Sequence, residues 1–282
     1  MRAMAHAFLA RHGNEEARLE SDLLVAHALG LDRLGLLMKL DAQLQTSEVD
    51  RARELLVRRS KHEPVAYITG SREFYGRAIL VGSGALVPRP ETELLVDLAR
   101  SWYSDWAVAE NNSCARVLDL GTGSGCLAAT LALELEEARV LAVDRSEEAL
   151  AWAQRNVEAL ELAERVELAL GDGLELAEAR GPFDLLVSNP PYVDPASAAS
   201  LAADVRDHEP GMALFAPDQD LDFWARELLQ RSRSLLAPGG MLLVELGYDQ
   251  GPRVLEIAQG LGLQVELRKD LAGIERVLEA RA

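Results

Sequence analysis

The chain has 282 residues, of which 49% are hydrophobic, enough for a full-sized domain and a second, smaller one. Its formal net charge of −17, from 46 acidic and 29 basic residues, lacks the Lys/Arg excess with which nucleic-acid-binding proteins neutralise phosphates. We therefore expect no direct nucleic-acid binding. Two cysteines, Cys114 and Cys126, without a nearby pair of histidines argue against a disulfide framework and a zinc site, and no metal is expected.

The beginning of the chain lacks the uninterrupted apolar stretch of a signal peptide. No apolar run approaches the ~20 residues that a membrane span needs. We therefore expect a cytoplasmic protein that does not associate with membranes. The acidic charge is typical of a solvated surface, and it would also suit a basic protein partner.

Residues 1–62 are expected to be helical throughout. Leucines such as Leu19 and Leu23 recur at helical spacing, and a further segment over 47–61 begins with the helix-start residue Ser47. Short helices without an internal proline predict a small helical bundle as a separate N-terminal domain. Residues 63–90 have a different character: the segments 65–68 and 72–75 flank Thr-Gly-Ser, which predicts a β-hairpin linker.

Residues 91–282 are expected to form an α/β domain of the Rossmann-like type. After a helix over 91–106, apolar strands alternate with helices, which argues for βαβ units and a parallel sheet. The last two strands are expected to be antiparallel. Together these features predict a seven-stranded sheet, with strands over residues 116–120, 139–143, 165–170, 183–187, 241–246, 263–267 and 275–278.

A glycine-rich turn follows the first strand of this domain. Its spacing, G-x-G-x-G, differs from the G-x-G-x-x-G of dinucleotide-binding proteins, and the carboxylate of Asp119 would repel a pyrophosphate. A carboxylate suits a positively charged ligand, such as the amino group of a methionine moiety. The motif favours S-adenosylmethionine over NAD, and a turn without a ligand is the alternative. The predicted cofactor-binding residues of this turn are Asp119, Gly121, Thr122, Gly123, Ser124 and Gly125.

Two further acidic residues follow the next strands. Asp144 ends the second strand, where an acidic residue can accept both ribose hydroxyls, although it could instead be the N-cap of the helix from Ser146. Asp172, beside Gly173, follows the third strand and could accept a hydrogen bond from the adenine amino group. Turn chemistry alone would also explain Asp and Gly at that position.

The fourth strand is followed by Asn189-Pro190-Pro191-Tyr192. Two prolines stiffen the chain at the carboxyl edge of the sheet, where open α/β folds bind ligands. The Asn189 side-chain oxygen and the Pro190 carbonyl can each accept one N–H of a substrate –NH₂. Such binding aims the lone pair of the substrate nitrogen at the sulfonium methyl group of S-adenosylmethionine. Tyr192 can stack on the amide. We predict that Asn189, Pro190 and Tyr192 are catalytic; a plain exit from the strand is the alternative.

With these motifs, the chain resembles the release-factor glutamine methyltransferases, the HemK or PrmC family, over nearly its whole length. The resemblance rests on P-V-A-Y-I-T-G-S-R-E-F-Y-G (64–76), V-P-R-P-E-T-E (87–93), D-L-G-T-G-S-G (119–125), V-S-N-P-P-Y-V (187–193), D-V-R-D-H-E-P (204–210) and L-V-E-L-G-Y-D-Q (243–250). It implies methyl transfer to the amide N5 of the glutamine in the Gly-Gly-Gln loop of peptide-chain release factors, with an N-terminal domain that helps to hold the factor.

The resemblance also implies that Asn189 touches the cofactor and that Pro191 belongs to the substrate site with the rest of the tetrad. It implies as well that Phe74 and Arg89 line the entrance for the glutamine. Packing of Phe74 in the core and a salt bridge from Arg89 to Glu91 or Glu93 are the alternatives. The chain departs from the family pattern at residues 215–221, where Phe-Ala-Pro-Asp-Gln-Asp-Leu replaces a glycine-rich turn.

Three other functions compete with this interpretation. The first is a related enzyme that methylates a glutamine of a large-subunit ribosomal protein. The second is a DNA adenine N6-methyltransferase that uses the same tetrad on a flipped base, against which the acidic charge argues. The third is a non-catalytic binding module, against which the intact glycine turn and Asn189 argue.

Overall fold

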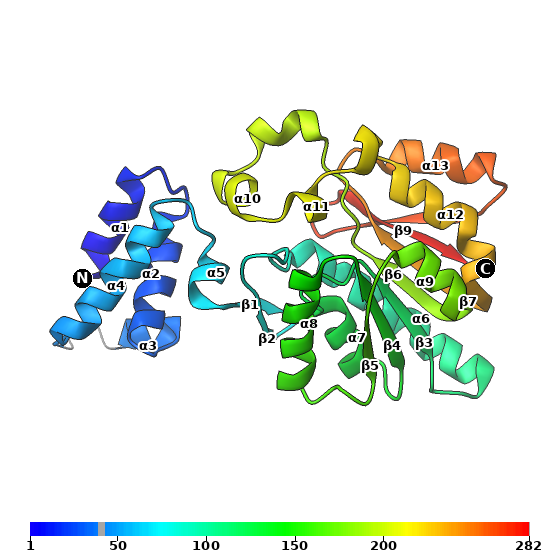
Figure 1. Cartoon of the computed structure of the whole chain (residues 1–282), viewed down its shortest axis with the longest axis horizontal. Helices are drawn as coiled ribbons and strands as arrows, with labels where there is room; N and C mark the ends of the chain where they lie inside the picture. The colour runs from blue at the N-terminus through cyan, green and yellow to red at the C-terminus, as the bar shows by residue number, and fades with distance from the viewer. Residues whose placement is uncertain (39–42, 282) are drawn as a thin grey trace. The chain divides into compact units, whose positions relative to one another are not determined.

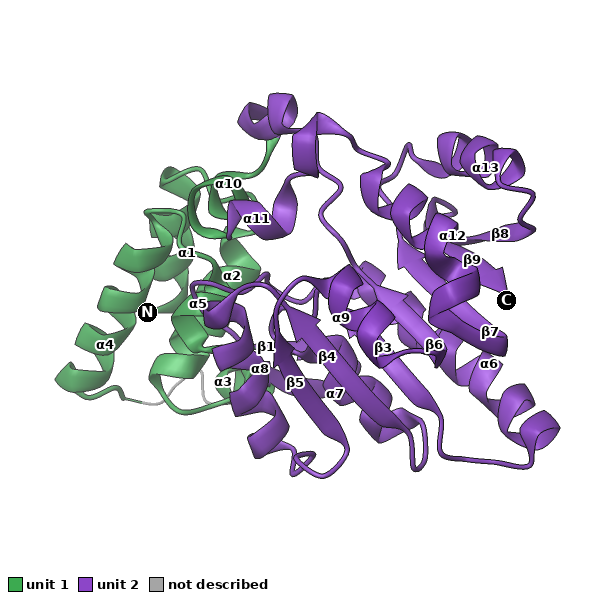
Figure 2. Ribbon diagram, turned by 45° about the vertical axis from the view of Figure 1, so that its right-hand side comes forward, with its two compact units in different colours: residues 1–71, 201–209 green, residues 72–200, 210–282 purple. Residues whose placement is uncertain are grey.

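The computed structural model of the protein describes residues 1–38 and 43–281. The chain separates into two compact units (Figure 2). The first comprises Met1–Ser71 with Leu201–Glu209, and the second comprises Arg72–Ser200 with Pro210–Ala282. Over the described residues, every helix is too short or too polar to cross a membrane.

The first unit is helical, as predicted for the N-terminal region. Its core is formed by small and branched apolar side chains, among them Leu9, Leu24 and Leu56, which recur on one face of each helix. Its helices are α1 (Arg2–Arg11), α2 (Ala17–Ala28), α3 (Arg33–Met38), α4 (Thr46–Arg59), α5 (Val65–Thr69) and the later α10 (Ala203–His208).

The β-hairpin lies further along the chain than predicted. The expected strand over 65–68 is instead α5, because Pro64 begins a helical turn there and Gly70, at φ +81°, ends it. The hairpin is formed by β1 (Ser71–Phe74) and β2 (Arg77–Leu80), joined by Tyr75-Gly76 with φ of +50° and +72°. Two consecutive residues with positive φ are what a two-residue hairpin turn requires.

The second unit contains the predicted seven-stranded sheet, in the order β5-β4-β3-β6-β7-β9-β8 (Figure 1). The strands from β5 to β7 are parallel, and β9 pairs antiparallel with both β7 and β8. The predicted α/β fold is thereby confirmed. The strands are β3 (Arg116–Leu120), β4 (Arg139–Asp144), β5 (Val166–Leu170), β6 (Phe183–Ser188), β7 (Leu236–Glu245), β8 (Val265–Lys269) and β9 (Glu275–Arg281).

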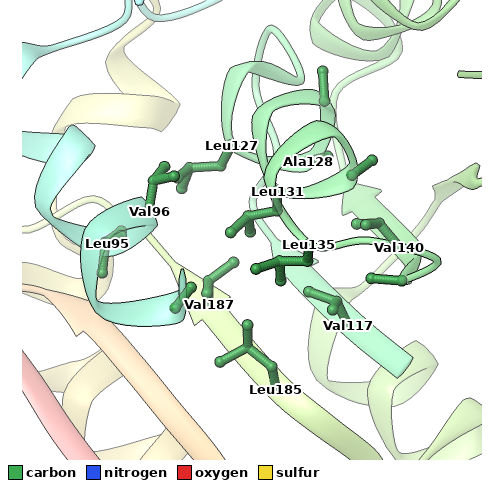
Figure 3. Packing of buried hydrophobic residues seen from close by; sticks show 14 of the residues in the cluster. Leu95, Val96, Val117, Leu127, Ala128, Leu131, Leu135, Val140, Leu185 and Val187 are labelled. Atoms are coloured by element: carbon green, nitrogen blue, oxygen red, sulfur yellow. The ribbon is translucent and has the colours of Figure 1, made fainter. Parts of the chain in front are cut away.

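Helices cover both faces of the sheet, because successive strand residues point to opposite sides. Val117 packs on one side with α6 (Glu93–Glu110), α7 (Cys126–Glu134) and α8 (Glu147–Ala159). Figure 3 shows part of this cluster, in which Leu131 of α7 and Val96 of α6 lie beside Val187 of β6. Leu118 packs on the other side, with α9 (Gly173–Arg180), α12 (Phe223–Leu235) and α13 (Gly251–Gly260).

The strand order brings the two sequence motifs together. The chain leaves β3 for β4 on one side, and β6 later pairs on the other side of β3, so a crevice opens at the carboxyl ends of β3 and β6. Leu120 and Ser188 are register partners, and the Ser188 hydroxyl donates a hydrogen bond of 2.7 Å to the Leu120 carbonyl. The glycine-rich turn and the Asn-Pro-Pro-Tyr tetrad therefore start from adjacent points. The remaining short segments of the described chain are η1 (Pro90–Thr92), η2 (Pro195–Ser200), α11 (Gly211–Leu214) and η3 (Pro217–Gln219).

Candidate active site

A cavity of about 730 Å³ opens at this edge and lies entirely within the second unit. Its volume falls within the range of about 300–1,000 Å³ that is usual for small-molecule sites. The wall is built from the loops that follow β3, β4, β5 and β6, together with residues 84–89 and part of the segment from Pro210. The predicted site residues on the wall are Arg89, Gly121, Thr122, Gly123, Ser124, Asp144, Asp172, Gly173, Asn189, Pro190 and Pro191.

The glycine-rich turn has the backbone shape that its sequence suggests. Gly121, Gly123 and Gly125 have φ of +79°, +57° and +77°, in the left-handed region that favours glycine. A Cβ at Gly121 or Gly123 would meet no atom within 4 Å, so these two glycines open onto free space. At Gly125 a Cβ would lie 3.0 Å from the Cβ of Ala153 on α8. The turn therefore presents backbone without side chains to the cavity, and at Gly125 it packs closely against α8.

Asn156 of α8, 1% exposed, holds the turn from the side opposite the cavity, and no sequence motif pointed to it. Its side-chain amide donates hydrogen bonds of 2.8 Å to the carbonyls of Ser124 and Leu80. Its side-chain oxygen accepts one of 2.7 Å from the Leu80 main-chain amide. A single buried side chain thus fixes the end of the hairpin and the glycine turn in one position.

Asp119 lies beneath the cavity, which differs from the expectation that its carboxylate faces the ligand. It is fully buried, and its Oδ2 accepts hydrogen bonds from the Thr122 hydroxyl at 2.6 Å and the Ala128 main-chain amide at 3.0 Å. Its Oδ1 is buried without a hydrogen-bond partner. Burial raises the pKa of this carboxyl to about 7. In this arrangement Asp119 shapes the turn and the start of α7.

Asp144 stands on the cavity wall and is linked to the glycine turn. Its Oδ2 accepts a hydrogen bond of 2.8 Å from the Gly123 main-chain amide, and its Oδ1 accepts one of 2.9 Å from that of Ser146. The N-cap of α8 is Ser146, whose hydroxyl oxygen accepts from the Ala149 amide at 3.2 Å. Asp144 is therefore not the cap, and each of its oxygens has a second lone pair to offer a ligand.

Asp172 stands on the wall below β5 and is the N-cap of α9. Its Oδ1 accepts hydrogen bonds from the main-chain amides of Leu174 and Glu175, at 3.0 and 3.3 Å. The turn chemistry considered from the sequence is thus present, and it leaves Oδ2 as the oxygen that could meet a ligand. At Gly173 a Cβ would lie 3.0 Å from Cγ of Leu120, so a larger residue would require Leu120 to move.

The tetrad belongs to a buried hydrogen-bond network that the sequence did not reveal. The Asn189 side-chain Nδ2 donates to Oγ1 of Thr92 at 2.9 Å, and the Thr92 hydroxyl donates to Oε2 of Glu245 at 2.6 Å. The Tyr192 hydroxyl donates to Oε1 of Glu245 at 3.1 Å. Thr92 and Glu245 are each 2% exposed. Glu245 ends an apolar strand, as Asp144 does, and this shared position was the signal that could have found it.

Burial governs the ionisation of the groups in this network. It raises the pKa of Glu245 to about 7, although hydrogen bonds from Thr92 and Tyr192 and the charge of Arg276 act in the opposite direction. Burial and the nearby Glu245 also raise the pKa of the Tyr192 phenol well above its ordinary value. Tyr192 is therefore a neutral donor at physiological pH, and its hydroxyl is engaged by Glu245.

The two residues expected at the entrance lie in different surroundings. Phe74 is 1% exposed and packs in the core under α6 and α7, so the expectation that it lines the entrance is wrong in this structure. It ends the short strand β1 and belongs to a buried cluster that includes residues of the sheet, and burial of the ring favours that position. Arg89 lies on the cavity wall.

The residues of the cavity fit S-adenosylmethionine. The wall carries Asp144, Glu147, Glu148 and Asp172 against Arg89 and Arg145, a balance that favours a cationic ligand such as a sulfonium. The open backbone at Gly121 and Gly123 admits a closely bound group, and two carboxylates stand at the ends of β4 and β5. In the described part of the chain, His, Cys, Asp and Glu residues form no group of three or more that could hold a metal ion.

Comparison with known proteins agrees with the site. Residues 1–70 match the model of the PrmC N-terminal domain, and residues 107–205 match that of the methyltransferase small domain. A release factor glutamine methyltransferase of Geobacter sulfurreducens is 41% identical over 97% of this chain and 93% of its own length. One of Chlorobaculum tepidum is 38% identical over 98% of this chain and 94% of its own length.

Among solved structures, the catalytic domain of hMettl16 in complex with a MAT2A 3'UTR hairpin has a TM-score of 0.60. It is 16% identical, with 78% of this chain and 82% of that chain covered, and at this identity the likeness concerns the fold alone.

Fold and site together define a Rossmann-like methyltransferase. Because the curated relatives match nearly from end to end, the chain belongs to the release factor glutamine methyltransferase family.

Proposed function

We propose that this protein transfers a methyl group from S-adenosylmethionine to the side-chain amide nitrogen, N5, of the glutamine in the Gly-Gly-Gln loop of peptide-chain release factors. The observation that carries the proposal is the fixed orientation of the Asn189 side chain on the cavity wall, one strand away from the glycine-rich turn. The names of the relatives, which match 97% and 98% of the chain, support the choice of acceptor.

The cofactor end of the cavity would be formed by the turn at Gly121–Gly125 and by the acidic residues after β4 and β5. Asp144 would accept hydrogen bonds from the ribose hydroxyls with its remaining lone pairs, and Asp172 would accept one from the adenine amino group. The bound cofactor supplies an electrophilic methyl group. Asp144 also holds the turn in place through the Gly123 amide, so the same carboxylate would fix the glycine-rich turn and bind the ribose.

The acceptor end would be formed by Asn189 and Pro190. The Asn189 Nδ2 is engaged by Thr92, so Oδ1 is the end of the amide that can accept an N–H of the incoming glutamine. The Pro190 carbonyl would accept the other N–H. Held at both hydrogens, the glutamine nitrogen directs its lone pair toward the methyl group, and positioning of this kind can lower a barrier by about 7–11 kcal/mol. The new carbon–nitrogen bond forms as the sulfur–carbon bond breaks, and one amide proton then leaves to solvent.

We further propose that the helical domain, residues 1–62, holds the body of the release factor. The first unit exposes large apolar side chains, with Met4 71%, Leu34 65% and Met38 79% exposed. Exposed apolar side chains on a small helical unit are suited to a protein partner. Action on release factors would place the enzyme in the cytoplasm, where translation occurs.

The test is methyl transfer from labelled S-adenosylmethionine to purified acceptors: a release factor, the same factor with its Gly-Gly-Gln glutamine replaced, and a mixture of large-subunit ribosomal proteins. We expect label on the intact release factor alone. Label on a ribosomal protein in its place would leave the chemistry intact and refute the proposed substrate.

A further inference from the structure

Both ends of the Asn-Pro-Pro-Tyr tetrad are tied to one buried carboxylate. Glu245, at the carboxyl end of β7, accepts a hydrogen bond from Thr92 at Oε2 and from Tyr192 at Oε1. Thr92, at the end of η1, accepts in turn from Nδ2 of Asn189. The first and the last residue of the tetrad thus reach the same side chain by two routes, and neither Thr92 nor Glu245 belongs to the tetrad itself.

The direction of these hydrogen bonds follows from the chemistry of the groups. A threonine hydroxyl has one proton, and above about pH 7, where the Glu245 carboxyl is ionised, that carboxylate can only accept. Thr92 therefore gives its proton to Glu245 and turns a lone pair toward Asn189. Only the NH₂ end of the Asn189 amide can meet that lone pair, since Oδ1 would face another acceptor. The carboxylate of Glu245 thereby decides, through one hydroxyl, which way round the Asn189 amide stands.

We propose that Thr92 and Glu245 are positioning residues that hold Oδ1 of Asn189 as the acceptor for an N–H of the substrate amide. This inference rests on the proposed function, because it concerns the side chain that would bind the glutamine. A flipped Asn189 would present its NH₂ group to the NH₂ of the substrate, and two donors would oppose each other. Orientation of Asn189 is therefore a condition for binding the reacting nitrogen in a productive pose.

Tyr192 gives the network its second attachment. The hydroxyl donates to the Glu245 oxygen that Thr92 does not use, and the rigid Pro190-Pro191 pair spans the distance between Asn189 and Tyr192. Because each carboxylate oxygen serves one end of the tetrad, loss of the carboxylate would release both ends, whereas loss of the Thr92 hydroxyl would release only Asn189. The two changes are thus separable.

The experiment compares Thr92→Val, which keeps the shape and removes the hydroxyl, with Thr92→Ser, which keeps the hydroxyl. Thr130→Val is the matched control, because Thr130 is also fully buried in the second unit but its hydroxyl has no hydrogen-bond partner. We expect Thr92→Val to lower kcat for the release factor by about 10- to 100-fold. Thr92→Ser should retain most of kcat, and Thr130→Val should leave it unchanged. The Kd for S-adenosylmethionine should change little in all three variants.

A second readout does not depend on turnover. The side-chain amide signals of Asn189, assigned by ¹⁵N NMR from their loss in Asn189→Ala, report its hydrogen bond. We expect these signals to shift and their protons to exchange faster with water in Thr92→Val, and to resemble the wild type in Thr92→Ser. If Thr92→Val fails to fold, Thr92→Ala provides the same comparison, and Glu245→Gln tests the carboxylate directly.

The outcomes separate this inference from the proposed function. If the wild type methylates the release factor while Thr92→Val retains full kcat, or if the Asn189 signals are unchanged, the positioning role is wrong and the proposed function stands. If the wild type methylates no release factor, the proposed function is wrong, and the NMR comparison still decides whether Thr92 orients Asn189.

Discussion

The main-chain amide of Gly123 donates a hydrogen bond of 2.8 Å to Oδ2 of Asp144, so the glycine-rich turn after β3 is tied to the end of β4. Without this bond, a turn made of left-handed glycines would have many accessible conformations. The carboxylate that is proposed to bind the ribose therefore also fixes the conformation of the turn against which the cofactor would lie.

Asp144→Ala should mainly weaken binding of S-adenosylmethionine. Loss of a charged acceptor costs about 1.5–3 kcal/mol, which corresponds to an increase in Kd of about 10- to 150-fold. Titration calorimetry measures this directly, with Glu256→Ala, an exposed change on α13, as the control. An unchanged Kd would show that Asp144 acts only on the protein backbone.

Asn189→Ala should separate binding from chemistry. The proposed role of Asn189 is to orient the substrate nitrogen, so we expect turnover to fall by about 10²-fold or more, while the Kd for S-adenosylmethionine changes by only a few-fold. Single-turnover rates and calorimetry on the same preparation give the two values. Turnover near that of the wild type would remove Asn189 from the mechanism.

Gly125→Ala should destabilise the protein more than Gly239→Ala. Both glycines have nearly the same left-handed φ, +77° and +78°, but only at Gly125 would the new Cβ meet a neighbour, 3.0 Å from the Cβ of Ala153. Backbone strain of about 1 kcal/mol should appear in both, and crowding should add about 1–3 kcal/mol at Gly125. Urea unfolding measures the difference, and equal losses would refute the close packing behind the turn.

The buried carboxyl of Glu245 should leave a signature in the pH dependence of stability. Its pKa rises from an ordinary 4.5 to about 7 on folding, so between these values the folded state holds a proton that the unfolded state has lost. Stability from this group is therefore present at low pH and is lost as the pH rises toward 7. Arg276 on β9 and Glu91 on η1 act on it with opposite signs, and Tyr192 and Thr92 donate to it.

Glu245→Gln removes that titration. Relative to the wild type, the variant should gain stability as the pH rises from 4.5 to 7, by about 1–3 kcal/mol in total. The slope is the readout, because any constant loss from altered hydrogen bonds does not depend on pH. Urea unfolding of both proteins at several pH values provides it, and parallel pH profiles would show that Glu245 ionises normally.

Within the first unit, Arg59 should be more important for stability than other arginines. It is 6% exposed and bonds to Glu20 at 2.6 Å and to Asp204, of the segment 201–209, at 3.3 Å. Arg59→Ala removes the cationic partner of both carboxylates. Because Glu20 and Asp204 are only partly buried, the cost should lie between that of an exposed pair and the about 3–5 kcal/mol of a fully buried one. Arg53→Ala, which breaks an exposed pair with Asp50, should cost about 1 kcal/mol or less. Similar losses in thermal unfolding would contradict this difference.

The alternation of strands and helices was sufficient to predict the seven-stranded fold, because strands buried on both faces are apolar and end at acidic or glycine-rich turns. The strand over 65–68 was predicted wrongly. Val, Tyr and Ile suggest a strand there, but Pro64 starts a helical turn and the chain needs Tyr75 and Gly76 for the hairpin. In this segment the geometry of the flanking turns outweighs the strand propensity of the individual residues.

The residues of the candidate site were predicted only in part. Glycines and prolines at the strand ends reveal where a ligand can approach, so most predicted site residues lie on the cavity wall. The hydrogen bonds among Thr92, Glu245 and Asn189 join residues far apart in sequence, and no local pattern encodes them: Glu245 follows Thr92 by 153 positions. The position of Phe74 was predicted wrongly because an aromatic residue in a sequence motif can pack in the core as well as line a binding site.

The proposed function is tested by locating the methyl group by tandem mass spectrometry after a release factor has been incubated with the enzyme and S-adenosylmethionine. We expect a methyl group on the side-chain amide nitrogen of the Gly-Gly-Gln glutamine, and none when the enzyme carries Asn189→Ala. Methylation at another residue, or unmethylated release factor from an enzyme that binds S-adenosylmethionine, would contradict it.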